Sequence, residues 1–128
     1  QVREGVRKPD EREAFLLEQE KRECEIFGRL ADLGMRPLVG TDAGCGYTFF
    51  DETWLEMELL CRRCGLTPEK AIHAATLEGA RALGYGDFLG RLAPGYEADF
   101  IAAAQNPIQD IEAFRHIKHV VCRGKIIE

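Results

Sequence analysis

The sequence lacks three features that would place the protein at a membrane or on nucleic acid. Its 128 residues contain no apolar run that approaches the roughly 20 residues needed to span a bilayer. Its 17 Lys and Arg residues are scattered among 22 Asp and Glu residues, which leaves a net charge of −5 and no basic stripe. The first five residues are polar and lack the apolar core of a secretory signal. We therefore expect no membrane or nucleic-acid partner and a cytoplasmic location.

The sequence also lacks the even, regularly spaced cysteine set of a disulfide framework. Its five cysteines are Cys24, Cys45, Cys61, Cys64 and Cys122, and reduced thiols are the simpler interpretation. Cys61 and Cys64 form a C-x-x-C just before Gly65, at the predicted C-terminal end of a helix. Redox motifs use the opposite end, where the helix dipole stabilises a thiolate. A zinc site would need a second pair of soft ligands, and the spacing of His116 and His119 predicts opposite faces of a strand.

The composition is that of a folded protein, and the order of the predicted elements indicates the α/β class. Hydrophobic residues make up 45% and charged residues 30% of the sequence, as in globular proteins. Apolar positions at helical spacing predict a helix over residues 10–33, ended by Gly34. Residues 36–41 have the length and apolar bias of a buried strand. A helix followed by a tight turn and a short buried strand is half of an α/β unit.

Two further helices are predicted after this strand. Asp51 or Thr53 can cap the first, Thr53 and Glu56 fit a capping box there, and the helix should end at Gly65. Thr67 can cap the second helix, because Pro68 follows it in the first turn, where the missing N–H of proline costs nothing. Small apolar residues continue this helix to a glycine at position 84, a typical C-terminal residue.

The pattern of turns and apolar residues in the last third of the sequence predicts a small β unit. A Pro-Gly pair at positions 94 and 95 suits a type II turn that joins two strands, the second over residues 98–103. One or two helical turns are expected within residues 108–114. Residues 117–123 and 125–127 predict a hairpin around a glycine.

Asp42 is the candidate functional residue. It follows the predicted strand within the run Val39-Gly40-Thr41-Asp42-Ala43-Gly44, so one carboxylate is delivered into a glycine-flanked turn. An aspartate at the end of a buried strand can hold a metal ion or take a proton from a metal-bound water, and small neighbours let a substrate approach closely. A plainer alternative is that Asp42 caps the turn.

Four motifs in order resemble the C-terminal third of the metal-dependent amidohydrolase superfamily, in its imidazolonepropionase-like and Xaa-Pro dipeptidase-like branch. They are Gly40-Thr41-Asp42-Ala43-Gly44, Leu66-Thr67-Pro68-Glu69-Lys70-Ala71-Ile72-His73-Ala74-Ala75-Thr76, Gly90-Arg91-Leu92-Ala93-Pro94-Gly95-Tyr96-Glu97-Ala98-Asp99-Phe100 and Asn106-Pro107-Ile108-Gln109-Asp110-Ile111. The order of the four over residues 36–128 makes the resemblance specific, since any one of them occurs by chance.

The resemblance implies a fold and a reaction. It implies the C-terminal fragment of a (β/α)8 barrel, with a helix, the last barrel strand and two helices over residues 10–86. A lead over residues 1–9 precedes this segment, and residues 87–128 form a small β unit that belongs to the family's β-sandwich. Such enzymes hydrolyse C–N bonds of small amides, cyclic amides or dipeptides, so the substrate of the complete enzyme would be a small-molecule amide.

The resemblance also assigns Asp42 as a ligand of zinc or another divalent metal and as the general base. The family's other ligands are a His-x-His pair, a lysine or glutamate and two more histidines from earlier strands. This sequence has no His-x-His, and its three histidines all follow Asp42. A catalytic zinc takes about three protein ligands. We therefore expect no stoichiometric metal and no amide hydrolysis from this chain alone.

Other residues have a functional and a structural interpretation. His73 is expected to be a surface or packed residue of its helix rather than a ligand. Asp99 resembles a catalytic carboxylate, but its position favours a turn anchored through backbone N–H groups. Trp54, Phe49 and Phe50 would edge a substrate pocket in a complete barrel and would serve as interface anchors otherwise.

Two hypotheses for the whole chain follow. The first is the C-terminal part of a C–N hydrolase, inactive without its remaining segment. The second is a non-catalytic module that self-associates, because an isolated barrel strand leaves unpaired edges that a second copy can cover; a homo-oligomer is therefore expected. The chain opens without methionine, which suggests a piece of a longer protein, and a His-x-His encoded upstream would support the first hypothesis.

Overall fold

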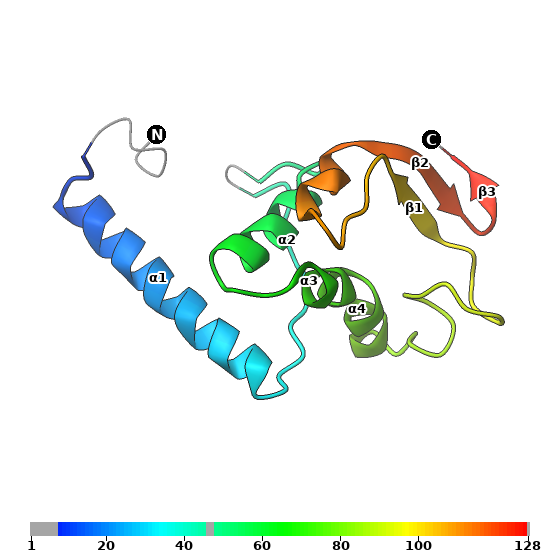
Figure 1. Cartoon of the computed structure of the whole chain (residues 1–128), viewed down its shortest axis with the longest axis horizontal. Coiled ribbons are helices and arrows are strands. Elements are labelled where there is room, and N and C mark those ends of the chain that lie inside the picture. The colour runs from blue at the N-terminus through cyan, green and yellow to red at the C-terminus, as the bar shows by residue number, and fades with distance from the viewer. Residues whose placement is uncertain (1–7, 46–47, 128) are drawn as a thin grey trace.

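The structure is a computed structural model in which residues 8–45 and 48–127 are described. Helices come first along the chain and a three-stranded sheet comes last (Figure 1). The elements are α1 (Glu11–Asp32), α2 (Thr53–Arg62), α3 (Pro68–Ala75), α4 (Leu77–Ala82), β1 (Phe100–Ala103), the 3-10 helix η1 (Ile111–Arg115), β2 (Ile117–Cys122) and β3 (Lys125–Ile126). The described part of the chain is therefore an α/β fragment, as predicted.

Helix α1 confirms the long helix predicted at the start of the chain. Asp10 caps it by accepting a 2.8 Å hydrogen bond from the backbone N–H of Glu13, while the Glu13 carboxylate accepts one of 2.9 Å from the N–H of Asp10. This reciprocal pair is a capping box. The helix ends before Gly34, which takes a left-handed φ of 97°.

Helix α1 lies beside the rest of the molecule (Figure 1), and much of its apolar side is exposed. Phe15, Leu16 and Leu33 are 62%, 52% and 86% exposed. Its contact with the rest of the chain is at its C-terminal half, where Ala31 is buried and Asp32 forms a 2.9 Å ion pair with Lys70. The helix therefore forms from local signals, and few of its apolar side chains enter the core.

The strand predicted over residues 36–41 is not formed. The segment is extended, and it contacts α3 through the hydrogen bond from Val39 N–H to the carbonyl of Ala74, at 3.2 Å. A strand is defined by ladder pairing with a neighbour. Within the described residues, the three-stranded sheet is built from β1, β2 and β3, and none of them reaches this segment.

The capping box predicted at Thr53 and Glu56 is wrong. Helix α2 begins at Thr53 with Glu52 at the N-cap, and no side chain caps it. Glu56 is used elsewhere, because its carboxylate accepts a 3.2 Å hydrogen bond from the backbone N–H of Gly40. A long-range acceptor role has thus replaced the local one that the sequence suggested.

The next helix starts as predicted but is interrupted. The Thr67 hydroxyl accepts a hydrogen bond of 3.3 Å from the N–H of Lys70, and Pro68 occupies the first turn. Thr76, however, leaves the helical conformation with φ −128° and ψ −89°, and its hydroxyl donates to the carbonyl of Ile72 at 2.7 Å. Such back-bonding to the preceding turn competes with helix continuation. The predicted single helix is therefore two short ones, α3 and α4.

The β unit forms one antiparallel sheet in the order β1-β2-β3. Phe100 pairs with Val121 across β1 and β2, and Val121 pairs with Ile126 across β2 and β3, which confirms the predicted hairpin. The type II turn is also confirmed, since Gly95 has φ 88° and the N–H of Tyr96 donates to the carbonyl of Ala93 at 3.0 Å. No strand precedes that turn within the described residues, so this part of the prediction is wrong.

A small core joins the helical part to the β unit. Met57 of α2, Ala71 of α3 and Ile111 of η1 form its buried centre. Six partly buried side chains surround them: Val39, Trp54, Cys61, Ile72, Ala75 and Phe114. Because these residues come from four segments, the core is where the fold is closed by long-range packing.

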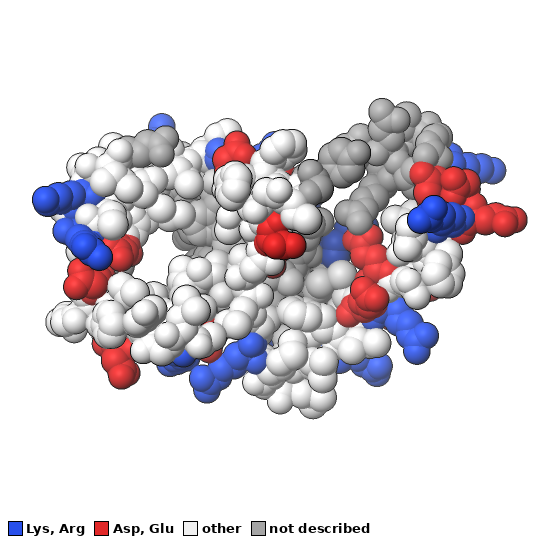
Figure 2. Space-filling model, turned by 180° about the vertical axis from the view of Figure 1, so that it is seen from behind, with Lys and Arg blue, Asp and Glu red and all other residues white. Residues whose placement is uncertain are grey.

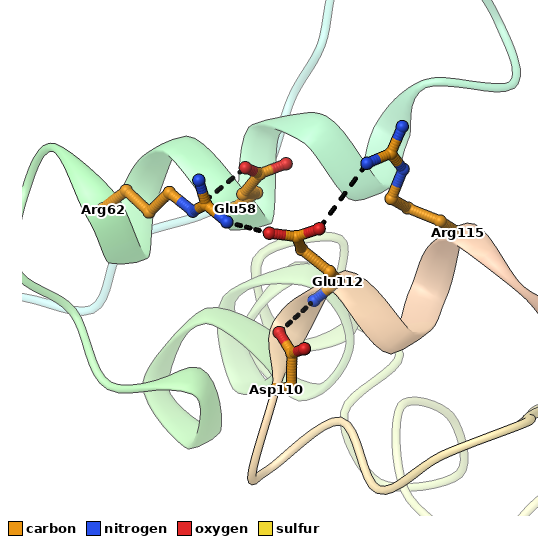
Figure 3. A network of polar contacts seen from close by, with 5 residues as sticks. All are labelled: Glu58, Arg62, Asp110, Glu112 and Arg115. Atoms are coloured by element: carbon orange, nitrogen blue, oxygen red, sulfur yellow. Dashed lines mark hydrogen bonds and ion pairs between the residues drawn. The ribbon is translucent and has the colours of Figure 1, made fainter.

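Charged side chains reinforce the same junction. Glu112 of η1 lies between two arginines (Figure 3): it pairs with Arg62 of α2 and, at 3.5 Å, with Arg115. Arg62 also pairs with Glu58 one turn earlier at 3.0 Å, and the N–H of Glu112 donates to Asp110 at 3.0 Å. The network therefore ties η1 to α2 above the core.

Elsewhere the described surface carries mixed charge. Figure 2 shows acidic and basic side chains next to each other on this face, with uncharged areas between the groups and no continuous basic area among the residues it colours. None of the helices in residues 8–45 and 48–127 combines the length and the apolarity of a membrane span.

Candidate functional site

Asp42 lies in a compact, strained turn after the extended segment. Its backbone has φ 50°, a left-handed conformation that is uncommon outside glycine and in which Asp and Asn are enriched. The Asp42 carbonyl accepts a 3.3 Å hydrogen bond from Cys45, and the N–H of Gly44 donates to Thr48 at 3.0 Å. The side chain of Asp42 is exposed. The turn thus presents the carboxylate outward, and such strain is found preferentially at functional sites.

Two helices hold the approach to this turn. Val39 packs on the core and donates its N–H to Ala74 of α3. Gly40 donates to the Glu56 carboxylate of α2, so the two residues before Thr41 are each fixed by a different helix. Glu56 is a positioning residue that no local pattern in the sequence indicates, because its contact with Gly40 crosses 16 positions. The position of Asp42 is therefore set by packing on α2 and α3.

The aromatic residues predicted near the site occupy different environments. Phe49 and Phe50 are 60% and 82% exposed, and the Phe50 ring lies against the turn, since a Cβ on Gly44 would be 3.0 Å from its Cζ. Trp54 is partly buried in the core, with the Arg115 guanidinium 4.7 Å from its ring centroid. Phe50 therefore flanks the Asp42 turn, whereas Trp54 supports the junction with η1.

The residues around Asp42 do not fit a catalytic metal centre. Within residues 8–45 and 48–127, no group of three or more His, Cys, Asp or Glu side chains is placed to hold an ion. The three histidines are exposed: His73 on α3, His116 after η1 and His119 on β2. A catalytic zinc needs about three protein ligands and an open position. Among the described residues, Asp42 therefore lacks the accompanying ligands of such a centre.

Asp99, the other carboxylate with a catalytic appearance, has a structural role. Its Oδ1 accepts a hydrogen bond of 2.6 Å from the backbone N–H of Arg123, in the turn between β2 and β3. This confirms the interpretation that Asp99 anchors a turn through a backbone N–H, although the turn is in the hairpin and not beside Pro94.

Comparison with known proteins relates this geometry to a family. The model of the Amidohydrolase family matches residues 17–127, which is most of the chain and includes Asp42. An imidazolonepropionase of Deinococcus deserti is 42% identical over 83 residues, and an ochratoxinase of Aspergillus niger is 37% identical over 99 residues. These matches cover 65% and 74% of this chain.

Solved structures show the same relationship. The crystal structure of a Xaa-Pro dipeptidase, with methionine bound in its active site, has a TM-score of 0.74 and 32% sequence identity over 82% of this chain. Only 25% of that chain is covered. The coverage of the imidazolonepropionase is 21% and that of the ochratoxinase 20%. The chain thus spans about a fifth to a quarter of the length of these relatives.

Proposed function

Because the chain belongs to the amidohydrolase family, we propose that it is the C-terminal part of a metal-dependent hydrolase acting on C–N bonds. The substrates of the complete enzyme are small amides, cyclic amides or dipeptides. The observation that carries the proposal is the Asp42 turn: one exposed carboxylate in a left-handed conformation, within a segment that matches the family. The names of the relatives support this substrate range, since they include an imidazolonepropionase and a Xaa-Pro dipeptidase.

In this proposal Asp42 is the catalytic and metal-binding side chain that the segment contributes, as general base and ligand of zinc or another divalent ion. The remaining ligands come from the part of the enzyme that this segment does not include. One observation supports the assignment: the approach to the turn is fixed by two helices, through Val39 on α3 and Gly40 on α2. The chain alone is proposed to be inactive and to bind no stoichiometric metal.

The proposed architecture accounts for the apolar side chains and the unpaired segment that this chain leaves exposed. Residues 10–86 are a partial barrel, preceded by the lead over residues 1–9, and residues 87–128 are part of a β-sandwich. Large apolar side chains are exposed in both parts, among them Phe15 and Leu33 of α1 and Ile126 of β3. An extended segment without ladder partners runs to Asp42. Exposed apolar surface on this scale indicates a missing interface, which the rest of the enzyme would cover.

A second candidate function, self-association, is supported by an exposed edge strand. Self-association into a homo-oligomer would also cover these apolar surfaces, and the short edge strand β3 with Ile126 70% exposed is available for pairing. Under this alternative the chain is a non-catalytic module, and a small-molecule substrate has no role. The two candidates differ in one expected result: only the first predicts hydrolase activity when the chain is joined to the missing part of the enzyme.

The first experiment uses the isolated chain. We expect purified protein to contain no stoichiometric zinc by elemental analysis and to leave N-acyl amino acids and dipeptides intact. Stoichiometric metal together with turnover would overturn the proposal that the chain alone is inactive. Sedimentation velocity on the same sample measures self-association: an oligomer without activity is the outcome expected from the second candidate.

The second experiment uses the coding sequence upstream of Gln1, in which we expect a His-x-His. Expression of the extended protein should yield metal binding and amide hydrolysis. Asp42→Asn in that protein should lower turnover by about 100-fold or more, the usual contribution of a general base. Asp87→Asn makes the same change at an exposed carboxylate outside the Asp42 turn, and this matched control should retain activity. An extended protein whose activity survives Asp42→Asn would contradict the role of Asp42.

A further inference from the structure

The thiols of Cys24 and Cys64 are in direct contact although they are far apart in the sequence. Their Sγ atoms are 2.9 Å apart, and the thiol of Cys64 donates a hydrogen bond to the sulfur of Cys24. Cys24 belongs to α1, and Cys64 lies just beyond α2 in the connection to α3. The contact therefore joins the helix that stands beside the molecule to the part that carries the core.

Backbone geometry favours this contact. Gly28 lies one helical turn after Cys24 on the same face of α1, and a Cβ at Gly28 would be 2.3 Å from the carbonyl oxygen of Cys64. Only glycine permits this approach of the two backbones. One turn further, Asp32 forms its 2.9 Å ion pair with Lys70. Positions 24, 28 and 32 thus form one stripe of α1 that faces the connection between α2 and α3 and the first turn of α3.

The neighbouring cysteine is directed elsewhere. Cys61 is packed against the core centre formed by Met57, Ala71 and Ile111. Cys45 and Cys122 are exposed and lie in other segments. The cysteine that faces Cys64 is therefore Cys24 and not its partner in the C-x-x-C.

We propose that Cys24 and Cys64 form a redox-responsive pair that closes to a disulfide and fixes α1 against the connection between α2 and α3. The link would enclose the segment that contains Asp42. In the reduced state, by contrast, the helix is held at this point by the Asp32–Lys70 ion pair and the packing around Gly28. The proposal is independent of the function proposed above.

The oxidant is a low-molecular-weight disulfide, R–S–S–R. The thiolate of Cys24 attacks one sulfur, the S–S bond breaks, and one R–S⁻ leaves, which gives a mixed disulfide on Cys24. Cys64 then loses its proton and attacks the Cys24 sulfur, and the second R–S⁻ leaves. The two R–S⁻ groups take up the protons from the two cysteines, so two cysteine thiols are oxidised and one R–S–S–R is reduced to two R–SH.

The environment of Cys64 suits it to the second step. Burial, followed by the hydrogen bond to Cys24 and the charges of Cys24 and Glu20, raises the pKa of Cys64 to about 12. A thiol in this state stays protonated, which leaves the first attack on the oxidant to Cys24. When Cys24 is capped as a mixed disulfide, its contributions to the raised pKa are removed. Cys64 then becomes available as the resolving thiol.

The test is disulfide mapping of the full chain after exposure to oxidised glutathione. Free thiols are blocked by alkylation, and the protein is digested with trypsin without reduction. Cys24 lies in the tryptic peptide 23–29, Cys64 in 64–70, and Cys45 and Cys61 both in 30–62, so the link between Cys24 and Cys64 has a mass that no other pairing gives. We expect peptides 23–29 and 64–70 to be linked and to separate after treatment with dithiothreitol. A link between peptides 30–62 and 64–70, or stable glutathione on both Cys24 and Cys64, would overturn the proposal.

Two glycine variants test whether the fold, and not random collision, makes the pair. Gly28→Ala should slow cross-linking by about tenfold, because the added Cβ meets the Cys64 carbonyl and separates the sulfurs. Gly79→Ala is the matched control, since a Cβ there meets nothing closer than 3.9 Å. Alanine also favours a helix over glycine, so slower linking cannot come from a weaker α1. Helical content by circular dichroism accompanies each rate, and equal rates in both variants would refute the proposed geometry.

Discussion

The carboxylate of Asp99 fixes the backbone of Arg123. Oδ1 accepts its 2.6 Å hydrogen bond from the N–H of Arg123, a residue that has a left-handed φ of 49°. Gly124 follows with φ 74°, so two consecutive residues of the hairpin turn have positive φ, as in the turns that match the twist of β-hairpins. A residue at the entrance of β1 thus stabilises the turn between β2 and β3, which explains how an arginine is accommodated there.

Removing this acceptor is expected to loosen the hairpin turn. Asp99→Ala should lower the free energy of unfolding by about 1 kcal/mol, the usual net value of an exposed hydrogen bond. The exchange rate of the Arg123 amide hydrogen should rise by about fivefold, which the same free energy implies. Asp99→Asn keeps an oxygen acceptor and should lose less. Unchanged exchange in Asp99→Ala, measured by NMR, would show that the bond does not hold the turn.

The ion pair between Arg62 and Glu112 is expected to contribute modestly to the junction of α2 with η1. The Arg62 side chain is 60% exposed and that of Glu112 31%, so solvent screens their attraction. A double-mutant cycle with Arg62→Ala and Glu112→Gln should give a coupling of about 0.5 kcal/mol at low salt. The coupling should fall when salt is added, because the pair is near the surface.

The neighbouring Arg63 supplies the control for this cycle. No ion pair of Arg63 is found among the described residues, and Arg63→Ala should show no coupling to Glu112→Gln. Urea unfolding followed by circular dichroism measures all of these variants. Equal coupling for Arg62 and Arg63 would mean that the network in Figure 3 does not act as a specific link.

The features that could be predicted from the sequence have short-range signals. Helix α1 was predicted because its apolar spacing, its polar start and Gly34 lie within one segment, and the hairpin because Gly124 separates two strand patterns. Asp42 was identified in the same way, from the glycines on either side of it. Its left-handed φ of 50° is consistent with such a turn.

The features that were missed depend on residues far apart in the sequence. Residues 36–41 have the composition of a strand, but a strand requires neighbours to pair with. Glu56 accepts from Gly40 across 16 positions, and the contact of Cys24 with Cys64 spans 40. No local pattern distinguishes a glutamate that caps its own helix from one that binds another segment. The contacts that position the candidate site could therefore be identified only from the structure.

The acidity of Cys64 gives a prediction about chemical modification. Burial is the largest cause that raises its pKa from the ordinary 9.0 to about 12. Because iodoacetamide reacts with thiolates, Cys64 in the native chain at pH 8 should be alkylated at least about tenfold more slowly than the exposed Cys122. The two rates are read from tryptic peptides 64–70 and 119–123. Denaturation in urea should abolish the difference, and equal native rates would contradict the buried environment.

The same raised pKa predicts how stability depends on pH. Between pH 9 and 12 the unfolded chain loses the Cys64 proton while the folded chain keeps it. The unfolded state therefore binds fewer protons in this window, and the free energy of unfolding falls as pH rises. Cys64→Ser removes the thiol and should reduce the steepness of this fall. The comparison is made by urea unfolding at several pH values, and identical slopes for the two proteins would contradict it.

Gly90 is expected to be the glycine at which a methyl group costs most. It has a φ of 90°, and a Cβ there would be 2.8 Å from the Cα of Leu77, 2.9 Å from the Cβ of Ala80 and 3.0 Å from the carbonyl oxygen of Thr76. The loop after α4 thus approaches the start of that helix so closely that a side chain at position 90 would overlap with it. Gly90→Ala should lower the free energy of unfolding by roughly 2 to 4 kcal/mol, from backbone strain together with steric overlap.

Gly95→Ala separates these two contributions. Gly95 has nearly the same φ, 88°, but a Cβ there would meet no atom within 4 Å, so the change adds strain alone. We expect it to cost about 1 to 2 kcal/mol. The difference between the variants, measured by urea unfolding at equal m-values, is the energy of the close contact with α4. Equal costs for the two alanines would mean that the loop at Gly90 is not packed closely against α4.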